Sequence, residues 1–301
     1  MTDALEHLSP EYRPYALLPD EQRKDWVRSD RWISYPIGDL ALARLDGLLH
    51  YPKRSRMPCL LITGDTGMGK SKILEKFARG HPEAYNEGTG ITSQPVLFVE
   101  TPPEPSADDM YSEILQAIGA AYGAGDPVRD LATAVKVLQR MGCRLLMFDE
   151  IHNIGDAAGP RQQRVVLNAL RYLTNKLHIP LVCAGTARAE LLIRLDDQLA
   201  ERFEHLALPK WTSGPGLEQL LLRLSSILPL RRPSSLSGPR ARRLIIEMTA
   251  GHTNRIFKLI ETLTIQAIDS GDERIDEASL SADGLIMPLL SMTAARGKAM
   301  A

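Results

Sequence analysis

Residues 64–71 carry the sequence Gly64-Asp65-Thr66-Gly67-Met68-Gly69-Lys70-Ser71, which matches G-x-x-x-x-G-K-[ST], the pattern of a phosphate-binding loop. The apolar run from Cys59 to Thr63 before this loop predicts a strand, and the residues from Lys70 to Arg79 after it predict a helix. In that setting the glycines let backbone N–H groups surround a phosphate, and the helix N-terminus favours its negative charge. We expect all eight residues to bind nucleotide, with the Lys70 ammonium also serving catalysis and the Ser71 hydroxyl holding Mg²⁺. The alternative is a glycine turn without a ligand.

A second motif, Leu145-Leu146-Met147-Phe148-Asp149-Glu150, consists of four apolar residues followed by two carboxylates. A buried strand would deliver Asp149 at its C-terminal edge, where the carboxylate can hold Mg²⁺ through water, and Glu150 would orient an attacking water. Apolar strands that end in acidic residues are common, so this motif gains its meaning from the loop at residues 64–71. Together the two motifs predict a site that binds ATP with Mg²⁺ and hydrolyses the ATP.

Three further polar residues are candidates by position. Thr186 follows the apolar run from Ile179 to Ala184, so we expect its hydroxyl beside the γ-phosphate; the alternative is a plain helix cap. Arg202 precedes another strand and is a candidate arginine finger toward the nucleotide of a neighbouring subunit; the alternative is a surface salt bridge. Arg255, in Gly251-His252-Thr253-Asn254-Arg255, opens a helix that could close over the same nucleotide.

Apolar runs alternate with amphipathic helical patterns over much of the chain, which predicts an α/β fold with a parallel sheet between two layers of helices. The expected strands are Cys59–Thr63, Val96–Val99, Arg144–Phe148, Ile179–Ala184 and Leu206–Leu208. The expected helices of this core are Ile37–Leu49 and four that begin near Lys70, Asp108, Val128 and Arg161. Beyond Trp211 only helical patterns remain, over Leu217–Leu228, Pro239–Ala250 and Thr253–Ile268.

These patterns divide the chain into four segments. Residues 1–36, with several prolines and many charges, suggest an N-terminal arm that packs on another part of the protein. Residues 37–212 form the α/β nucleotide-binding domain, and residues 213–280 form a small all-helical lid domain. Residues 281–301 are rich in Ala, Met and Ser and predict a flexible C-terminal tail.

The composition limits the function classes. With 36 Lys and Arg against 37 Asp and Glu, the net charge of -1 excludes a protein that coats nucleic acid by bulk attraction. The sequence lacks an apolar run long enough to span a membrane and a signal-peptide pattern at its start, so we expect a cytoplasmic protein without a membrane partner. The three cysteines, Cys59, Cys143 and Cys183, lie in or beside apolar runs and are predicted to be reduced core residues.

The motifs resemble those of AAA+ ATPases of the initiator clade, over roughly Ile37 to Ile268. More closely, four segments resemble the TniB/TnsC family of transposition ATPases: residues 64–70, Phe148-Asp149-Glu150-Ile151-His152-Asn153, Cys183-Ala184-Gly185-Thr186 and Leu208-Pro209-Lys210-Trp211. The resemblance implies a sensor role for Thr186, an arginine finger at Arg202 and a second sensor at Arg255. It also places Ile37, after Tyr35 and Pro36, where the family packs the adenine.

The same resemblance implies a function. It describes an ATP-dependent DNA-binding protein that assembles on target duplex DNA as rings or filaments, selects the target, and recruits and activates a DDE transposase. A TniQ-type target-selection protein is a further implied partner. ATP hydrolysis would control disassembly, and the DNA-bound protein would associate with the nucleoid.

Local basic clusters are the candidates for DNA contact in a chain of neutral charge. They are Lys53, Arg54 and Arg56 before the first strand, Arg161 and Arg164 near residue 160, and a segment, residues 231–258, with seven basic residues against one acidic. The alternative for each is a solvated charged face. Because each subunit offers only a few phosphate contacts, an ATP-held assembly would add them and bind DNA well.

Three other functions share part of the pattern. A helicase loader or replication initiator has the same core and sensors, although an initiator's winged-helix domain would need more than the roughly 30 residues after Ile268. A DExH helicase is suggested by Asp149-Glu150-Ile151-His152 but needs two such cores. A signalling AAA+ switch that does not bind DNA would hold nucleotide without turnover.

Overall fold

Five strands form one parallel sheet in the order β4-β5-β6-β1-β7. The strands are β1 (Cys59–Thr63), β4 (Val96–Glu100), β5 (Leu145–Asp149), β6 (Leu181–Gly185) and β7 (Phe203–Ala207). Because β1 lies inside the sheet, all five of its residues are buried. The computed structural model describes residues 5–88, 90–120, 127–156, 159–281 and 288–292.

Strand register brings the functional segments to one edge of the sheet. Thr63, the last residue of β1, pairs with Gly185 on one side and with Ala207 on the other. Asp149 ends β5 and pairs with Glu100, the last residue of β4. The residues that follow β1, β5 and β6 therefore start from the same C-terminal edge.

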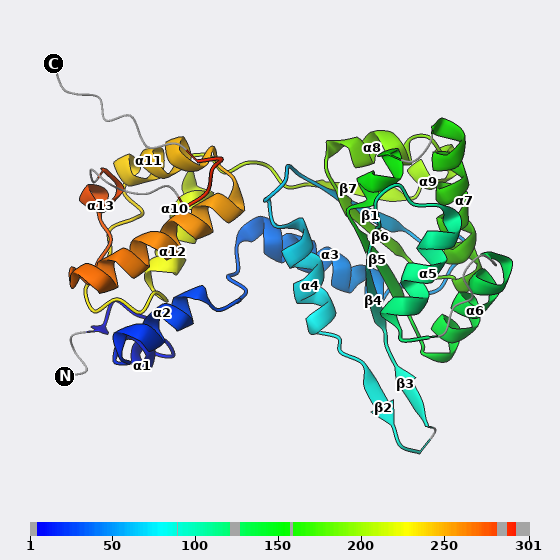
Figure 1. Ribbon diagram of the computed structural model, residues 1–301, viewed down its shortest axis with the longest axis horizontal. Coiled ribbons are helices and arrows are strands. Elements are labelled where there is room, and N and C mark those ends of the chain that lie inside the picture. The colour runs from blue at the N-terminus through cyan, green and yellow to red at the C-terminus, as the bar shows by residue number, and fades with distance from the viewer. Residues whose placement is uncertain (1–4, 89, 121–126, 157–158, 282–287, 293–301) are drawn as a thin grey trace. The chain divides into compact units, whose positions relative to one another are not determined.

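Helices cover both faces of the sheet, which confirms the predicted three-layer α/β class (Figure 1). Alternate strand residues, such as Leu61 and Phe148, share a buried cluster with apolar residues of helices on one face. These helices are α5 (Ala107–Ala117), α6 (Pro127–Arg140) and α7 (Pro160–Leu177). Figure 1 shows α3 (Pro36–Leu49) and α4 (Lys70–Arg79) on the opposite face.

Several strand ends differ from the sequence-based expectation. The run predicted from Ile179 begins as β6 only at Leu181, because Pro180 has no N–H to donate to a neighbouring strand. The last strand is Phe203–Ala207 rather than Leu206–Leu208; three of its five residues are exposed, so this edge strand lacks a continuous apolar run. Arg144 lies outside β5, and its N–H donates instead to the Pro95 carbonyl over 2.8 Å.

Short elements of this unit carried no usable periodicity in the sequence. They are the hairpin of β2 (Ala84–Asn86) and β3 (Ile91–Ser93), the 3₁₀ turn η2 (Ile151–Asp156), and the helices α8 (Ala187–Ile193) and α9 (Asp197–Ala200). The hairpin strands have three residues each, and η2 has six, which is too short for a pattern of period 2 or 3.6 to stand out.

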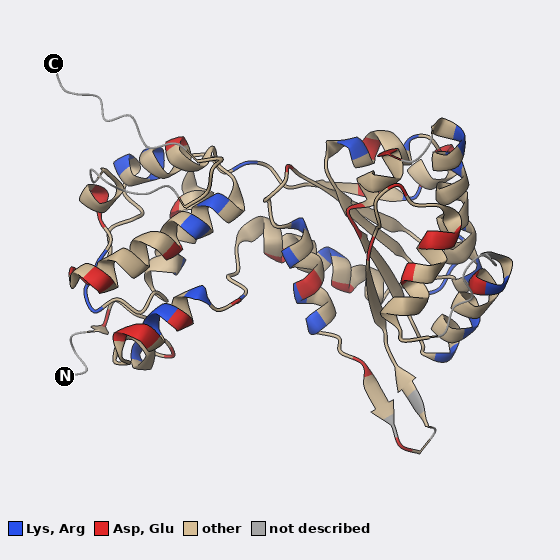
Figure 2. Cartoon of the chain, viewed as in Figure 1, with Lys and Arg blue, Asp and Glu red and all other residues tan. Residues whose placement is uncertain are grey.

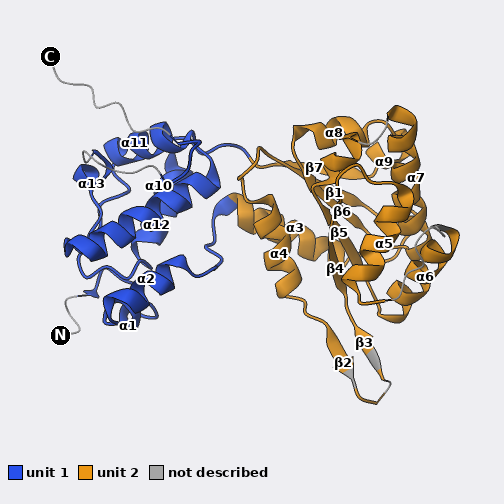
Figure 3. Ribbon diagram, viewed as in Figure 1, with its two compact units in different colours: residues 1–36, 209–301 blue, residues 37–208 orange. Residues whose placement is uncertain are grey.

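The chain divides into two compact units (Figure 3). Residues 37–208 make the α/β unit described above. Residues 1–36 and 209–301 together make a second unit, here called the helical unit, whose described residues contain no strand. Its helices are α1 (Arg13–Ala16), α2 (Asp20–Arg28), α10 (Pro215–Ser225), α11 (Pro239–Thr249), α12 (Thr253–Ser270) and α13 (Glu277–Ser281).

A buried arginine joins the N-terminal residues to the rest of the helical unit. The Arg23 guanidinium, on α2, is fully buried and donates to both carboxylate oxygens of Glu273 over 2.7 and 2.8 Å. It also donates to the Pro229 carbonyl over 3.0 Å and to Asp20 over 2.7 Å. Residues 1–36, expected as an arm, thus share one core with residues 209–301.

Three remaining expectations concern the chain's ends, its cysteines and membranes. Most of the predicted tail at 281–301 lies outside the described residues. All three cysteines are free and buried, as predicted, and burial raises the pKa of Cys59 to about 11 and that of Cys143 to about 12. Among the described helices, none combines the length and the apolar character needed to cross a bilayer.

Replacing Arg23 by alanine should lower the free energy of unfolding of the helical unit by about 3 to 5 kcal/mol, because it leaves the largely buried Glu273 carboxylate without its main partner. All three tryptophans, Trp26, Trp32 and Trp211, belong to this unit, so tryptophan fluorescence during urea unfolding reports on it. Arg28→Ala, on the same helix, removes only an exposed ion pair and should cost less than about 1 kcal/mol. Equal losses in the two variants would contradict a structural role for the buried pair.

Candidate functional site

The loop at residues 64–71 joins β1 to α4 in a conformation that requires glycine at defined places. Gly67 and Gly69 have positive φ angles of 81° and 94°, a region that other residues avoid. At Gly64, a Cβ atom would lie 3.1 Å from both the Cβ and the carbonyl oxygen of Leu208. Met68 is buried within the loop, whereas Asp65 and Thr66 are exposed.

Lys70 stands at the start of α4 with only 4% of its surface exposed. Its Nζ donates to the carbonyl oxygens of Gly64 and Asp65 over 2.9 and 3.1 Å. Burial lowers the pKa of Lys70 below its usual value, while the nearby carboxylates of Glu150 and Asp149 act in the opposite direction. The ammonium group is therefore held between the loop and the acidic pair.

The acidic pair occupies the end of β5. Asp149 is buried, and its Oδ1 accepts a hydrogen bond from the Glu150 N–H over 2.8 Å. Glu150 has a positive φ of 51°, a strained backbone conformation for a residue other than glycine. Its Oε2 lies 3.2 Å from Nε2 of His152, a residue of η2 that had no predicted role.

Thr186 lies at the same edge, directly after β6. It is the N-cap residue of α8, but its side chain makes no cap hydrogen bond. Its Oγ1 is buried, and no residue in the described ranges supplies a hydrogen-bond partner. A buried hydroxyl without a partner is unusual in proteins. Thr186 therefore caps α8 by its position, but its side chain takes no part in the cap.

The donors at this edge fit a nucleotide with Mg²⁺. The ion prefers oxygen ligands, and the Ser71 hydroxyl and the Asp149 carboxylate are the protein groups that would hold it. The described residues contain no cluster of three or more His, Cys, Asp or Glu suited to a metal. Mg²⁺ commonly takes its other ligands from phosphate oxygens and water.

Arg202 is not part of this edge. It precedes β7, and its carbonyl accepts from the N–H of Cys59, the first residue of β1. A strand of five residues spans about 16 Å, so Arg202 lies at the opposite end of β1 from the loop. Its Nη1 donates to Asn175 over 2.7 Å, and its buried Nε has no partner among the described residues.

Arg255 and Ile37 each lie in the first turn of a helix. Arg255 is half-buried in the first turn of α12, in the helical unit. Gly251, just before that helix, has a φ of 71° and packs so tightly that a Cβ would lie 2.3 Å from the Trp211 carbonyl oxygen. Ile37 is half-buried in the first turn of α3. The roles of Arg255 and Ile37 stay predictions.

The basic candidates for DNA contact lie at different places. Lys53 and Arg54 are exposed at the end of the sheet where β1 begins. Arg161 and Arg164 are exposed in the first turns of α7. This helix follows β5 and η2, so it starts from the C-terminal edge of the sheet that carries the loop at residues 64–71, here called the nucleotide edge. Figure 2 shows basic and acidic residues interspersed along the helices. The structure therefore does not bring Lys53 and Arg54 together with Arg161 and Arg164.

Acidic partners neutralise much of the basic segment at 231–258. Four of its seven basic residues form ion pairs: Arg231 with Glu273, Arg240 with Glu277, Arg242 with Glu218 and Lys258 with Glu261. Arg255, Arg232 and Arg243 make no ion pair with the described residues. For most of this segment the solvated, paired face is thus the better description.

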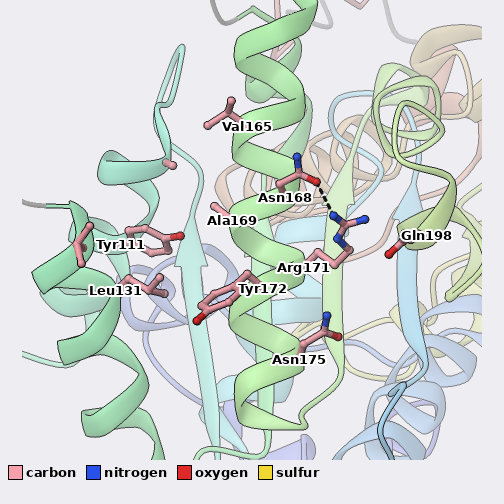
Figure 4. A pocket seen from close by; sticks show the side chains of 11 residues that line it. Tyr111, Leu131, Val165, Asn168, Ala169, Arg171, Tyr172, Asn175 and Gln198 are labelled. Atoms are coloured by element: carbon pink, nitrogen blue, oxygen red, sulfur yellow. Dashed lines mark hydrogen bonds between the residues drawn. The ribbon is translucent and has the colours of Figure 1, made fainter.

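A surface hollow of about 600 Å³ lies apart from the nucleotide edge, over α5, α6 and α7 (Figure 4). Figure 4 shows Tyr111, Leu131, Val165 and Tyr172 around it, with Asn175 near its end. Val165 and Tyr172 are exposed apolar residues. Because Asn175 accepts a hydrogen bond from Arg202, the hollow and Arg202 belong to one continuous surface.

A parallel sheet with a phosphate-binding loop after β1 and an Asp-Glu pair at the end of β5 is the arrangement of a P-loop AAA+ protein, and solved structures agree on this fold. Cdc6p from Pyrobaculum aerophilum matches with a TM-score of 0.59 at 16% identity, covering 85% of this chain and 69% of that one. The Aeropyrum pernix ORC2 protein (ADPNP-ADP complexes) gives 0.58 at 17%, with coverage of 84% and 69%. The ORC1 protein of the same organism, in complex with DNA, gives 0.57 at 19%, with coverage of 89% and 67%.

A family model described as "Bacterial TniB protein" matches residues 23–213. This match covers more than half of the chain and includes the complete nucleotide edge, so the chain belongs to the TniB family. The predicted AAA+ class and family are confirmed. A search of curated proteins finds no match.

Replacing Lys70 by alanine should abolish ATP binding, because the buried ammonium is the loop's only lysine and holds its carbonyls. Binding of a fluorescent ATP analogue, followed by anisotropy, measures the loss. Lys72→Ala is the matched control, since Lys72 lies on the same helix with an exposed side chain paired to Glu75. Retained affinity in the Lys70 variant would contradict the site.

Proposed function

We propose that the protein is an ATP-dependent DNA-binding transposition regulator. In this proposal it assembles on target duplex DNA, selects the target, and recruits and activates a DDE transposase, with a TniQ-type protein as a further partner. The observation that carries the proposal is the TniB match over residues 23–213, which contains an intact nucleotide site. Hydrolysis of ATP releases the assembly from DNA.

Each residue at the nucleotide edge has a task in hydrolysis. The loop N–H groups and Lys70 hold the phosphates, and Glu150 orients the attacking water and accepts its proton. The buried Thr186 hydroxyl, which has no partner among the described residues, supplies a hydrogen bond toward the γ-phosphate. Mg²⁺ held by Ser71 and Asp149 would neutralise charge on the phosphates when bound.

Assembly gives Arg202 its role. Because Arg202 lies at the far end of β1 from its own loop, it serves the nucleotide of a neighbouring copy. The exposed apolar residues of the adjoining hollow, such as Val165 and Tyr172, provide surface for the same contact between copies. In this way ATP hydrolysis is coupled to assembly.

Assembly also explains how a protein of net charge -1 binds DNA. Lys53, Arg54, Arg161 and Arg164 give each copy few phosphate contacts, so a single copy binds weakly. Copies held side by side by ATP add these contacts and gain avidity. The solved ORC1 protein, which shares the fold, is a complex with DNA.

ATP should raise the affinity for a random-sequence duplex at least tenfold over ADP, an order of magnitude that follows from linking several weak contacts. Anisotropy of a fluorescent duplex, measured with ATP, ADP and a slowly hydrolysed analogue, gives the affinities, and electron microscopy of the same samples shows rings or filaments. With ATP, Glu150→Gln should bind the duplex as tightly as the wild type does with the analogue. This complex should then retain a DDE transposase on the duplex. Equal DNA affinity in all nucleotide states would contradict control through assembly; no DNA binding in any state would favour a protein-directed AAA+ switch.

Replacing Arg202 by alanine should remove most ATP hydrolysis by the assembled protein and leave the slow hydrolysis of dilute monomer unchanged. The expected loss is about a thousandfold, the order found for arginine fingers. Phosphate release measured across a protein concentration series separates the two regimes. Arg194→Ala, which removes an exposed arginine paired with Glu190 in the same unit, is the control. An equal defect in the monomer would exclude a role toward a neighbouring copy.

A further inference from the structure

His152 stands between two parts of the nucleotide edge. Its Nε2 lies 3.2 Å from Glu150 Oε2. Its Nδ1 accepts a long hydrogen bond, of 3.5 Å, from the backbone N–H of Thr186. The ring therefore links the end of β5, which carries the proposed base, to the turn after β6, which carries the proposed γ-phosphate contact.

The two contacts determine which ring nitrogen carries the proton. A backbone N–H can only donate, so Nδ1 must be unprotonated to accept from Thr186. In the neutral ring the proton then lies on Nε2, which donates it to the Glu150 carboxylate. The ring thus uses both nitrogens, one on each side of the edge.

The surroundings keep the ring in this position. The His152 side chain is only 14% exposed, and η2 packs against β6 and α8. At Gly185 a Cβ would lie 3.2 Å from His152 Nδ1 and 2.8 Å from the Ala189 Cβ. Glycine at position 185 therefore leaves the space that the imidazole fills.

The Glu150 carboxylate needs a hydrogen-bond partner that fixes its orientation. Its side chain is 35% exposed and follows a strained backbone position, so packing alone leaves the carboxylate free to turn. A general base must lie within hydrogen-bond reach of the water it activates, and small misplacements cost large factors in rate.

We propose that His152 is a positioning residue that fixes the Glu150 carboxylate relative to the Thr186 turn. It holds the base through Nε2 and takes its own orientation from the Thr186 backbone through Nδ1. A shift of the Thr186 turn thereby moves the base. The proposal rests on the proposed function, since it assigns Glu150 as the base for ATP hydrolysis.

The test compares two substitutions of His152 with a control, in the full-length protein with duplex DNA present. His152→Ala should lower kcat for ATP about tenfold to a hundredfold while the affinity for a slowly hydrolysed ATP analogue stays within twofold of wild type. His152→Gln should recover most of kcat, because its amide both accepts from Thr186 and donates to Glu150. His50→Ala, an exposed histidine at the end of α3, should leave both quantities unchanged.

A second measurement needs no turnover. Nitrogen-15 spectra of protein labelled at histidine, without nucleotide, should show His152 protonated at Nε2 and not at Nδ1, with its resonances identified by their loss in His152→Gln. Glu150→Ala should shift the Nε2 resonance. A proton on Nδ1, or no shift in Glu150→Ala, would overturn the proposal.

The kinetic outcomes separate this inference from the function on which it rests. If the wild type hydrolyses ATP and His152→Ala keeps its kcat, the positioning role falls and the ATPase stands. Equal losses in His152→Ala and His152→Gln also overturn the positioning role. If the wild type binds ATP without hydrolysing it, the proposed function falls, and the inference falls with it.

Discussion

A buried ammonium group at the end of a buried strand is the constraint on which the α/β unit depends. The Lys70 charge can stay at that depth only with several oxygen partners around it. The carbonyls of Gly64 and Asp65 supply the first, and the loop must curl back through left-handed glycines to present them. The carboxylates of Asp149 and Glu150 supply the compensating charge. Since they end β5, the sheet order that places β5 near β1 is part of the same requirement.

The elements that the sequence predicted well are those whose signal is local. A run of buried residues such as Cys59–Thr63, followed by a glycine-rich turn and a helix, fixes both the strand and the loop after it. The parallel edge then follows from topology, so Asp149 and Thr186 were expected at the sheet edge where they lie, whereas their roles stay predictions. The TniB family model matches residues 23–213, the stretch that contains these motifs.

The features that the sequence did not reveal depend on contacts between distant residues or on single side chains. The hydrogen bond from Arg23 to Glu273 joins residues 250 positions apart, and no periodicity in the sequence predicts it. The proposed role of His152 depends on its hydrogen bond with the Thr186 backbone, 34 positions further along. A Glu-x-His spacing after an apolar strand was the available signal, but spacing alone does not show that both nitrogens are used. The ion pairs of the basic segment at 231–258 were hidden for the same reason, because its acidic partners Glu218, Glu261, Glu273 and Glu277 lie outside it.

The bond between Arg23 and Glu273 also orders events during synthesis. The α/β unit is one continuous stretch, residues 37–208, and is complete on the growing chain before the second part of the helical unit exists. Arg23 leaves the ribosome early, yet its acceptor follows 250 residues later, roughly 10 to 50 s at ordinary rates of translation. During that interval Arg23 lacks the carboxylate that it binds in the folded protein, so the α/β unit is complete on the chain before the N-terminal helices have the residues against which they pack.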